Sequence, residues 1–328
     1  MYAAVLRQFG EVPRYQTFPD PVPTEDELLV QVIATPLANV DRAQAAGTHY
    51  SSRATYPTLP AVIGGDGVGL IDGTLRAFGG CVPPFGAMAE RTIVPKAYAS
   101  YFLDVPSGVD PALAAAMPAS MLASLLPLTF GATLHPGETV LVQGATGFAG
   151  RLAVQVAKKL GAGRVIGSGR DRASLAALPA LGADAVIDLG QSDAQVAAAF
   201  RHAAGEAGYD VILDFLWGRS TEVLLSTFIP EELALAAKRV RLVQIGAAAG
   251  HAVSLEAEAL RTSGLEILGA SAGIIPAEVP ALAARAYAWI ASGDVAAEVE
   301  QVALKDIEQA WGREVHGRRL VVMPDISR

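Results

Sequence analysis

The fold is decided by one stretch, Thr139-Val-Leu-Val-Gln-Gly-Ala-Thr-Gly-Phe-Ala-Gly150. It opens with an apolar run typical of a buried strand, and its glycines lead into a helical pattern. The apolar residues of that pattern recur at spacings of three and four: Ala149, Leu152, Ala153, Val156 and Leu160. The stretch therefore predicts a strand, a glycine turn and a helix in direct succession.

The glycine turn has the features of a phosphate-binding loop. Gly147 and Gly150 would let the backbone approach a pyrophosphate, and the helix N-terminus would offer N–H groups to it. Ala145 stands where the usual G-x-G-x-x-G pattern has its first glycine. A bare structural turn is the alternative, but the strand before it, the helix after it and a second strand about 20 residues on favour a dinucleotide site. We expect this site to use Ala145, Thr146, Gly147, Phe148, Ala149 and Gly150.

The end of the second strand predicts which dinucleotide binds. It reads Gly167-Ser-Gly-Arg-Asp-Arg172, so Ser168 and Gly169 stand where an acid would hold the ribose 2′-OH of NAD. Arg170 and Arg172 can pair with a 2′-phosphate, and Ser168 can donate to it. The pattern favours NADPH. Two alternatives stay open: the arginines only solvate the next helix, or Asp171 is a displaced ribose acid.

The rest of the chain shows two different sequence patterns. From Leu134 onward, six apolar runs alternate with helical patterns, which predicts an α/β fold with a doubly wound parallel sheet. These runs are Val140–Val142, Arg164–Ile166, Ala185–Ile187, Val211–Leu213, Arg241–Ile245 and Leu265–Leu268. Up to Val94, short β-like runs lie between prolines and glycines, as in an irregular antiparallel β domain. The tail is too small for a core of its own and is expected to complete that first domain.

Composition narrows the class of protein. The chain has 328 residues, 25 Lys and Arg, 33 Asp and Glu, and a formal net charge of -8, which argues against a nucleic-acid partner. A lone cysteine, Cys81, excludes a disulfide scaffold and a cysteine-rich zinc module. The start shows no signal-peptide pattern, so we expect a cytoplasmic protein.

The uncharged segment Pro111–Leu134 is long enough to span a membrane, but Pro118 and Pro127 favour a buried connecting helix broken by proline over a membrane span.

Several motifs together resemble the medium-chain dehydrogenase/reductase superfamily over essentially the whole length. They are Pro136 to Gly150, Leu181-Gly-Ala-Asp184, Asp210-Val-Ile-Leu-Asp214, Val243-Gln-Ile-Gly246 and Ala87-Met-Ala-Glu90. The resemblance implies a GroES-like catalytic domain from residues 1–120 and 273–328, with a Rossmann domain over residues 121–272. Proteins of this kind commonly form dimers through the edges of their Rossmann sheets. We therefore expect a homodimer in which the apolar strand Leu265–Gly269 pairs with the same strand of a second copy.

The residues that this chain has at the zinc-ligand positions of that superfamily resemble those of its zinc-free, quinone oxidoreductase-like branch. Where zinc-dependent members have a ligand Cys three residues before an Asp, this chain has Ala38 before Asp41. Where they have Gly-His-Glu, it has Gly64, Gly65 and Asp66. The resemblance therefore implies transfer of a hydride from NADPH to a small electrophilic substrate, a quinone or an α,β-unsaturated carbonyl, without a metal.

Residues around the nicotinamide are expected at the carboxyl ends of the parallel strands. There the chain has Phe215, Leu216, Trp217, Ile245, Gly246, Ala270 and Ser271. From the first domain, Tyr50 and Asn39 are the candidates to hydrogen-bond the substrate oxygen and thus the candidate catalytic residues. Asn39 stands one residue later than in the N-x-x-D pattern of the superfamily.

Two other functions remain open on the sequence. Gly269-Ala-Ser-Ala-Gly273 matches the nucleophile elbow G-x-S-x-G, which would make Ser271 the nucleophile of a serine hydrolase, with Asp294 or Asp306 and then His316 completing the triad. The second open function is that of a protein that binds or senses NADPH without turnover, because the sequence offers few side chains that could act as a catalytic acid or base.

Overall fold

The computed structural model describes residues 1–229 and 238–324, which divide into two compact units. The first combines Met1–Ala119 with the chain from Ala283 onward, and the second is Ser120–Leu282. The tail thus returns to the first unit. The chain leaves the second unit and re-enters the first after Leu282, whereas the sequence analysis placed this boundary after residue 272.

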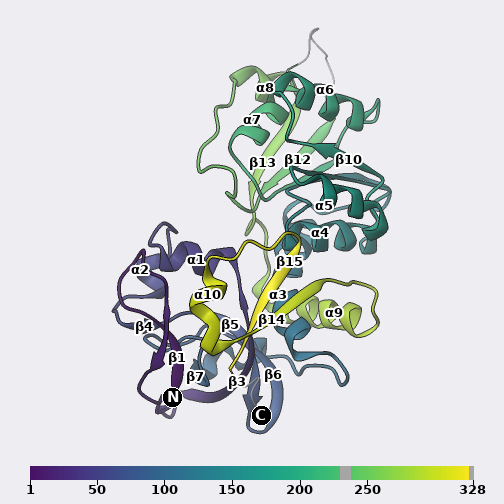
Figure 1. The fold of residues 1–328 in the computed structure, drawn as a ribbon. Helices are drawn as coiled ribbons and strands as arrows, with labels where there is room; N and C mark the ends of the chain where they lie inside the picture. The colour runs from purple at the N-terminus through teal and green to yellow at the C-terminus, as the bar shows by residue number, and fades with distance from the viewer. Residues whose placement is uncertain (230–237, 325–328) are drawn as a thin grey trace. The chain divides into compact units, whose positions relative to one another are not determined.

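The second unit is built on a six-stranded parallel sheet in the order β10-β9-β8-β11-β12-β13 (Figure 1). Its strands are β8 (Thr139–Gln143), β9 (Arg164–Gly169), β10 (Ala185–Asp188), β11 (Val211–Asp214), β12 (Arg239–Gln244) and β13 (Gly264–Gly269). Each corresponds to one of the six predicted apolar runs, so the predicted doubly wound sheet is confirmed. The order reverses between β8 and β11, and ligands of such sheets bind at this switch point.

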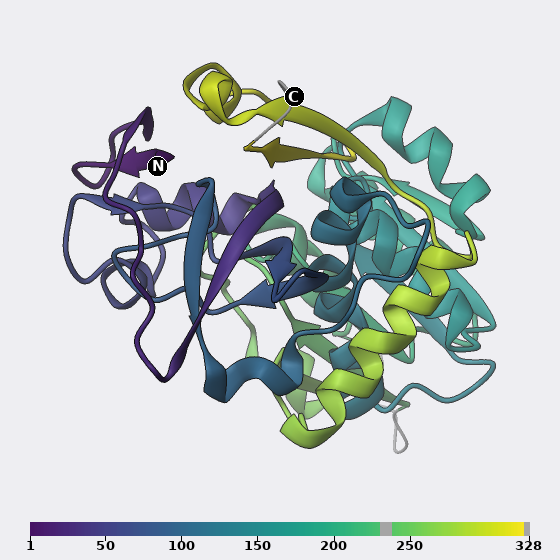
Figure 2. The same cartoon turned by 90° about the horizontal axis from the view of Figure 1, so that it is seen from below.

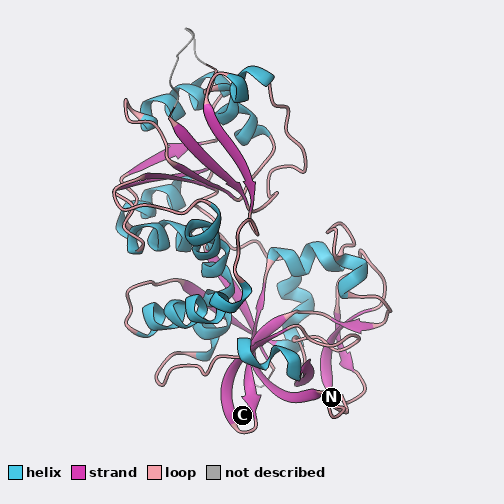
Figure 3. Cartoon of the chain, turned by 180° about the vertical axis from the view of Figure 1, so that it is seen from behind, coloured by secondary structure: helices cyan, strands magenta, loops and turns pink. Residues whose placement is uncertain are grey.

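Helices cover both faces of this sheet (Figure 3). They are α4 (Phe148–Lys159), α5 (Arg172–Ala177), α6 (Asp193–Ala204), α7 (Arg219–Ser226) and α8 (Ala257–Arg261). One face buries a core that includes Leu141, Ile166, Phe200, Ile212 and Leu242. Right-handed crossovers place α4 and α5 on one face and the later helices on the other, so the amino end of α4 lies at the switch point.

The first unit is β-rich. A three-stranded sheet has the order β2-β1-β4, and a second sheet has the order β14-β15-β3-β5-β6 with β7 also paired to β3. The strands are β1 (Tyr2–Leu6), β2 (Arg14–Thr17), β3 (Glu27–Leu37), β4 (Ala61–Val62), β5 (Asp66–Ile71), β6 (Thr74–Gly79), β7 (Arg91–Pro95), β14 (Glu298–Ala303) and β15 (Arg318–Met323). Because β15 pairs antiparallel with β3, both ends of the chain build one sheet (Figure 2).

The helices of this part of the chain are short except for two. They are α1 (Asn39–Ala45), α2 (Ser52–Thr55), α3 (Pro111–Leu126), which continues into the second unit, α9 (Val279–Ala291), which begins there, and α10 (Ile307–Trp311), with 3-10 turns at Lys96–Tyr101 and Leu304–Asp306. Two more 3-10 turns, at Leu178–Leu181 and Pro276–Glu278, belong to the second unit. The predicted break of α3 at Pro118 is wrong, since the helix continues through that proline. Its geometry changes at Pro127, where a π-helical stretch runs to Gly131.

The segment Pro111–Gly131 is long and apolar enough to cross a membrane by length and composition, with a mean hydropathy of 1.6. Of its most apolar window, 56% is buried inside the structure. Core helices of globular proteins have the same features. No other helix among the described residues passes that test.

Candidate functional site

The turn between β8 and α4 begins with Gly144, which the sequence analysis passed over in favour of Ala145. Gly144 has a φ of +86°, and a Cβ there would lie 3.0 Å from Leu216 Cδ2. Glycine is the residue that adopts this conformation without strain. The N–H groups of Gly144 and Ala145 donate to the carbonyl of Ser168 at 3.1 and 2.8 Å, which ties the turn to the end of β9. The position of Gly144 directly after a buried strand was the signal that could have found it.

Close packing explains the last glycine of the motif. A Cβ on Gly150 would lie 2.1 Å from the carbonyl oxygen of Gly144, so helix α4 can approach the turn only with glycine at this position. Gly147 is the N-cap, and the helix begins at Phe148. The amino end of α4 therefore lies at the carboxyl edge of the sheet, and this arrangement fits a bound pyrophosphate.

The ribose position at the end of β9 has no room for an acid. A Cβ on Gly169 would lie 2.3 Å from Thr146 Cγ2 and 2.6 Å from Thr146 Oγ1. Asp171, the alternative ribose acid, caps α5 by accepting the Ser174 N–H at 2.8 Å. This strand end therefore does not present the acid with which NAD sites hold the ribose 2′-OH.

The two arginines next to this position differ. Arg172 pairs with Asp188 at 3.0 Å. Arg170 is exposed and makes no hydrogen bond or ion pair within the described chain. Ser168 is fully buried, and its Oγ has no partner among the described residues, so that hydroxyl does not face a ligand at the surface. Arg170 is thus the accessible cation beside the ribose position.

A buried carboxylate organises the end of β11. Asp214 is fully buried and accepts hydrogen bonds from the N–H groups of Leu216 and Trp217, at 2.9 and 3.0 Å, and from Thr221 Oγ1 at 2.6 Å. Burial raises the pKa of Asp214. The sequence analysis assigned no role to this residue.

The predicted nicotinamide residues of β11 and β12 lie together. The carbonyl of Asp214 accepts the Ile245 N–H at 2.8 Å, and a Cβ on Gly246 would lie 2.8 Å from the carbonyl oxygen of Phe215. Because Leu216 also packs on Gly144, these residues form one continuous surface with the glycine turn. Their contact with a nicotinamide stays a prediction.

Ala270 and Ser271 follow β13 in a turn, in which the Ala272 N–H donates to the Gly269 carbonyl at 3.0 Å. The next helical turn starts only at Pro276. Among residues 1–229 and 238–324, the non-glycine residues with positive φ are Asp72, Thr133 and Trp217. Ser271 therefore lacks both the strained backbone and the supporting helix of a nucleophile elbow, which argues against the serine hydrolase alternative.

The two candidate catalytic residues lie in the first unit and are exposed. Asn39 is the first residue of α1, and Tyr50 is 95% exposed with its ring 4.2 Å from that of His49. Asp41 accepts the Ala38 N–H at 2.7 Å and so closes the amino end of α1. The roles of Tyr50 and Asn39 stay predictions.

Two acids of the first unit titrate far from their usual range. Burial, together with the charge of Asp66, raises the pKa of Asp41 to about 7, and burial raises the pKa of Asp66 to about 6. The Arg319 guanidinium opposes both shifts. Burial also raises the pKa of the Cys81 thiol to about 12.

Within the described ranges, no group of three or more His, Cys, Asp or Glu side chains is arranged to hold a metal ion.

A family model described as zinc-binding dehydrogenase matches residues 149–288. This segment covers most of the second unit. Ala38 and Gly65, the positions at which ligands are missing, lie outside the match.

Two curated relatives are oxidoreductases by name. The chain is 29% identical to quinone oxidoreductase-like protein 2 of Mus musculus over 189 residues, which cover 57% of this chain and 50% of the relative. It is 29% identical to the mitochondrial enoyl-[acyl-carrier-protein] reductase of Xenopus tropicalis over 175 residues, which cover 50% of this chain and 49% of the relative. The match thus spans about half the length of these curated relatives.

A solved structure extends the similarity to nearly the whole chain. The quinone oxidoreductase of Thermus thermophilus, also solved in complex with NADPH, is 28% identical, with a TM-score of 0.75 over 98% of this chain and 100% of that one.

Proposed function

This chain belongs to the medium-chain dehydrogenase/reductase superfamily, in its quinone oxidoreductase-like branch, and we propose that it is an NADPH-dependent oxidoreductase that reduces a quinone or an α,β-unsaturated carbonyl without a metal ion. The observation that carries the proposal is the strand end where Gly169 faces Thr146 and Arg170 is exposed beside it. The NADPH complex of the similar Thermus thermophilus structure supports the same cofactor.

Each part of the cofactor has a proposed set of residues. The glycine turn, Ala145 to Gly150, would hold the pyrophosphate at the amino end of α4. Arg170 would pair with the 2′-phosphate, with Ser168 and Gly169 at the same strand end. The residues that follow β11, β12 and β13 would border the nicotinamide: Phe215, Leu216, Ile245, Gly246, Ala270 and Ser271.

When bound, NADPH supplies the hydride. The acceptor must be electron-poor, because a carbon already polarised by its own carbonyl can accept a hydride without a Lewis acid. Tyr50 and Asn39 are proposed to donate a hydrogen bond to the acceptor oxygen. Metal independence is part of the proposal because Ala38 and Gly65 have no ligand atoms in their side chains.

The decisive experiment is the initial rate of NADPH oxidation with quinones, enones and enoyl thioesters, the last class being suggested by the enoyl reductase relative. We expect turnover with at least one class, a much lower rate with NADH, and no loss of rate after treatment with a chelator. Loss of rate on chelation, restored by zinc, would contradict the metal-free proposal.

A second candidate is a protein that binds or senses NADPH without turnover. The observation that favours it is the exposure of Asn39 and of Tyr50, at 95% for the latter, because neither is fixed by a buried partner. Tight NADPH binding with no oxidation by any acceptor would establish this function instead. A small-molecule partner, a homodimer and a cytoplasmic location remain proposals alongside both functions.

A further inference from the structure

The residues that follow β11 form a turn that joins two loops of the second unit. The Phe215 carbonyl accepts the Ala248 N–H at 3.3 Å in the segment after β12. The Leu216 carbonyl accepts the Ala249 N–H of the same segment at 2.7 Å. On the other side, Leu216 lies against Gly144, since a Cβ there would be 3.0 Å from Leu216 Cδ2. The turn therefore sets the spacing between the glycine turn after β8 and the segment after β12.

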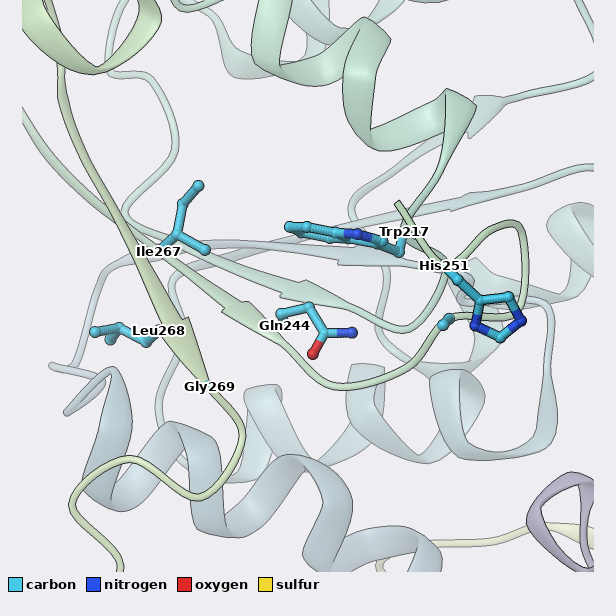
Figure 4. A pocket seen from close by; sticks show the side chains of 7 residues that line it. Trp217, Gln244, His251, Ile267, Leu268 and Gly269 are labelled. Carbon is cyan, nitrogen blue, oxygen red and sulfur yellow. The ribbon is translucent and has the colours of Figure 1, made fainter. Parts of the chain in front are cut away.

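The backbone of this turn has an unfavourable conformation. Trp217 has a φ of +55°, which a bulky residue rarely adopts. The following Gly218 has a φ of +64°, and a Cβ there would lie 2.7 Å from the carbonyl oxygen of Ala249. Figure 4 shows the indole of Trp217 and the side chain of Gln244, from β12, lining one pocket. Strain of this kind persists only where the surrounding structure over-determines it, so some group must hold the turn in place.

That group is the carboxylate of Asp214, the last residue of β11. Its Oδ1 accepts the N–H groups of Leu216 and Trp217 at 2.9 and 3.0 Å. Its Oδ2 accepts a hydrogen bond from Thr221 Oγ1 of α7 at 2.6 Å. Asp214 and Thr221 are both fully buried. Hydrogen bonds to a carboxylate are stronger than those between neutral groups, so one buried side chain fixes both N–H groups of the strained turn.

Gln143 connects this carboxylate to the glycine turn. It is fully buried and lies opposite Asp214 in the register between β8 and β11. Its Nε2 donates to Thr221 Oγ1 at 3.4 Å, and its carbonyl accepts the Phe215 N–H at 3.2 Å. Gln143 directly precedes Gly144 in the chain. The network thus extends from α7 through Asp214 to the start of the glycine turn.

A local Asx turn is the alternative explanation for Asp214. In such a turn an aspartate accepts the N–H of the residue two positions on, which accounts for the bond to Leu216. It requires neither full burial nor a partner from another element. The bonds to Trp217 and to Thr221, and the position of Gln143 behind them, therefore exceed what a local turn needs.

We propose that Asp214 is a positioning residue for the nicotinamide half of NADPH, an inference that rests on the proposed function. It acts through the N–H groups of Leu216 and Trp217, which keep the turn between the glycine turn and the segment after β12. The adenosine half should not depend on it, because β9 lies on the far side of β8 from β11. The Ser168 carbonyl of β9 also holds the glycine turn independently of Asp214, by accepting the Gly144 and Ala145 N–H groups.

The test compares two probes by calorimetry on the full chain. One is NADPH, and the other is adenosine 2′,5′-bisphosphate, which carries the 2′-phosphate but no nicotinamide. Asp214→Ala should weaken NADPH binding by about tenfold or more and change bisphosphate binding by less than about twofold.

Asp214→Asn is the conservative variant. It keeps Oδ1 for the two backbone N–H groups, and its Nδ2 can donate to Thr221 Oγ1. The Gln143 Oε1, which has no partner among the described residues, can then accept the Thr221 hydroxyl after rotation of the amide. We expect NADPH affinity within about threefold of the wild type.

Asp210→Ala is the matched control. Asp210 also accepts a backbone N–H, from Thr139 at 2.8 Å, and it pairs with Lys238 at 2.7 Å, but it precedes β11 at the opposite end of that strand. Its loss should destabilise the fold while the ratio of the two affinities stays at the wild-type value.

A second pair of variants serves if Asp214→Ala does not fold. Thr221→Val removes the donor to Asp214 Oδ2, whereas Thr221→Ser keeps it. The valine variant should weaken NADPH binding without weakening bisphosphate binding, and the serine variant should bind both probes like the wild type.

The outcomes separate this role from the proposed function. Equal losses for both probes in Asp214→Ala, or no loss, in a protein whose wild type binds NADPH, would overturn the positioning role and leave the proposed function intact. Equal weakening by Asp214→Asn and Asp214→Ala would assign the effect to the charge and also overturn it. A selective loss of NADPH affinity, in a protein whose wild type oxidises no NADPH with any acceptor, would support the positioning role while the proposed function fails. A wild type that does not bind NADPH would overturn both.

Discussion

Thr146 fills the space that any side chain at position 169 would need. A Cβ on Gly169 would lie 2.3 Å from Thr146 Cγ2, 2.6 Å from its Oγ1 and 3.0 Å from its Cβ. Since the Thr146 Cβ is itself this close, rotation of the threonine side chain does not clear the contact. One residue of the glycine turn thus prevents an acid at the strand end where NAD sites place it.

The first prediction tests this contact through stability. Gly169→Ala is expected to lower the free energy of unfolding by about 1 to 3 kcal/mol, because it overpacks a closed site. Thr146→Gly in the same chain should recover most of the loss. Urea unfolding of both single variants and the double variant gives the coupling energy between the positions. Gly269→Ala is the control, since nothing lies within 4 Å of a Cβ there. Additive effects of the two changes would contradict the contact.

The second prediction concerns the cofactor. Arg170→Ala should weaken NADPH binding by roughly 10- to 150-fold, because a charge-assisted phosphate contact contributes about 1.5 to 3 kcal/mol. NADH binding should be nearly unchanged. Arg172→Ala is the matched control and should have the smaller effect, since Arg172 already pairs with Asp188. Calorimetric titration of both cofactors checks this, and equal losses for NADPH and NADH would refute the 2′-phosphate assignment.

The third prediction follows from the pKa of Asp41, which burial raises to about 7. The folded state then binds a proton that the unfolded state releases near pH 4, so this carboxyl makes the free energy of unfolding fall as pH rises from about 4 to about 7. The fall amounts to at most about 4 kcal/mol. Asp41→Asn keeps an acceptor for the Ala38 N–H but removes the titration, and should gain stability relative to the wild type as pH rises.

Denaturant unfolding at a series of pH values checks the effect of Asp41→Asn. Asp72→Asn is the control, because Asp72 is exposed in the β5–β6 turn. Parallel stability curves for wild type and Asp41→Asn would show that folding does not change the pKa of Asp41.

The fourth prediction concerns Arg241, a buried cation of β12. It is 3% exposed, pairs with Glu138 Oε1 at 2.5 Å and donates to the Ala132 carbonyl at 2.6 Å. Arg241→Met should lower the free energy of unfolding by about 3 to 5 kcal/mol, because it leaves Glu138 without its buried partner. Arg239→Met, which breaks only the exposed pair with Glu266, should cost less than about 1 kcal/mol. Similar losses for both variants would contradict this account.

The fifth prediction concerns assembly. Strand β13 lies at one edge of the six-stranded sheet, and its Ile267 is 37% exposed. An apolar edge of this kind favours pairing with another strand, so we predict a C2 homodimer joined at β13. Ile267→Lys should convert the dimer into a monomer in sedimentation velocity runs at micromolar concentration. A wild-type monomer under the same conditions would rule out the dimer.

The layout of the second unit could be predicted from the amino-acid pattern alone. Six short apolar runs alternate with helical patterns, and α4 has apolar residues at spacings of three and four, so local pattern was enough to predict the parallel sheet. The turn at Gly147 and Gly150 was equally visible, because backbone approach requires residues without side chains. In the first unit the pattern predicted strands, but not that β15 would pair with β3.

Which of the predicted residues are accessible at the strand ends depends on the tertiary structure. Ser168 and Arg170 look alike as phosphate partners in the sequence, yet one is fully buried and the other exposed. Gly144 and Asp214 acquire their roles from contacts between β8, β11 and β12, which lie far apart along the chain. The raised pKa of Asp41 likewise comes from burial and the neighbouring Asp66. Periodicity records which face of an element is apolar, whereas burial, strain and charge at a single side chain depend on what the fold packs against it.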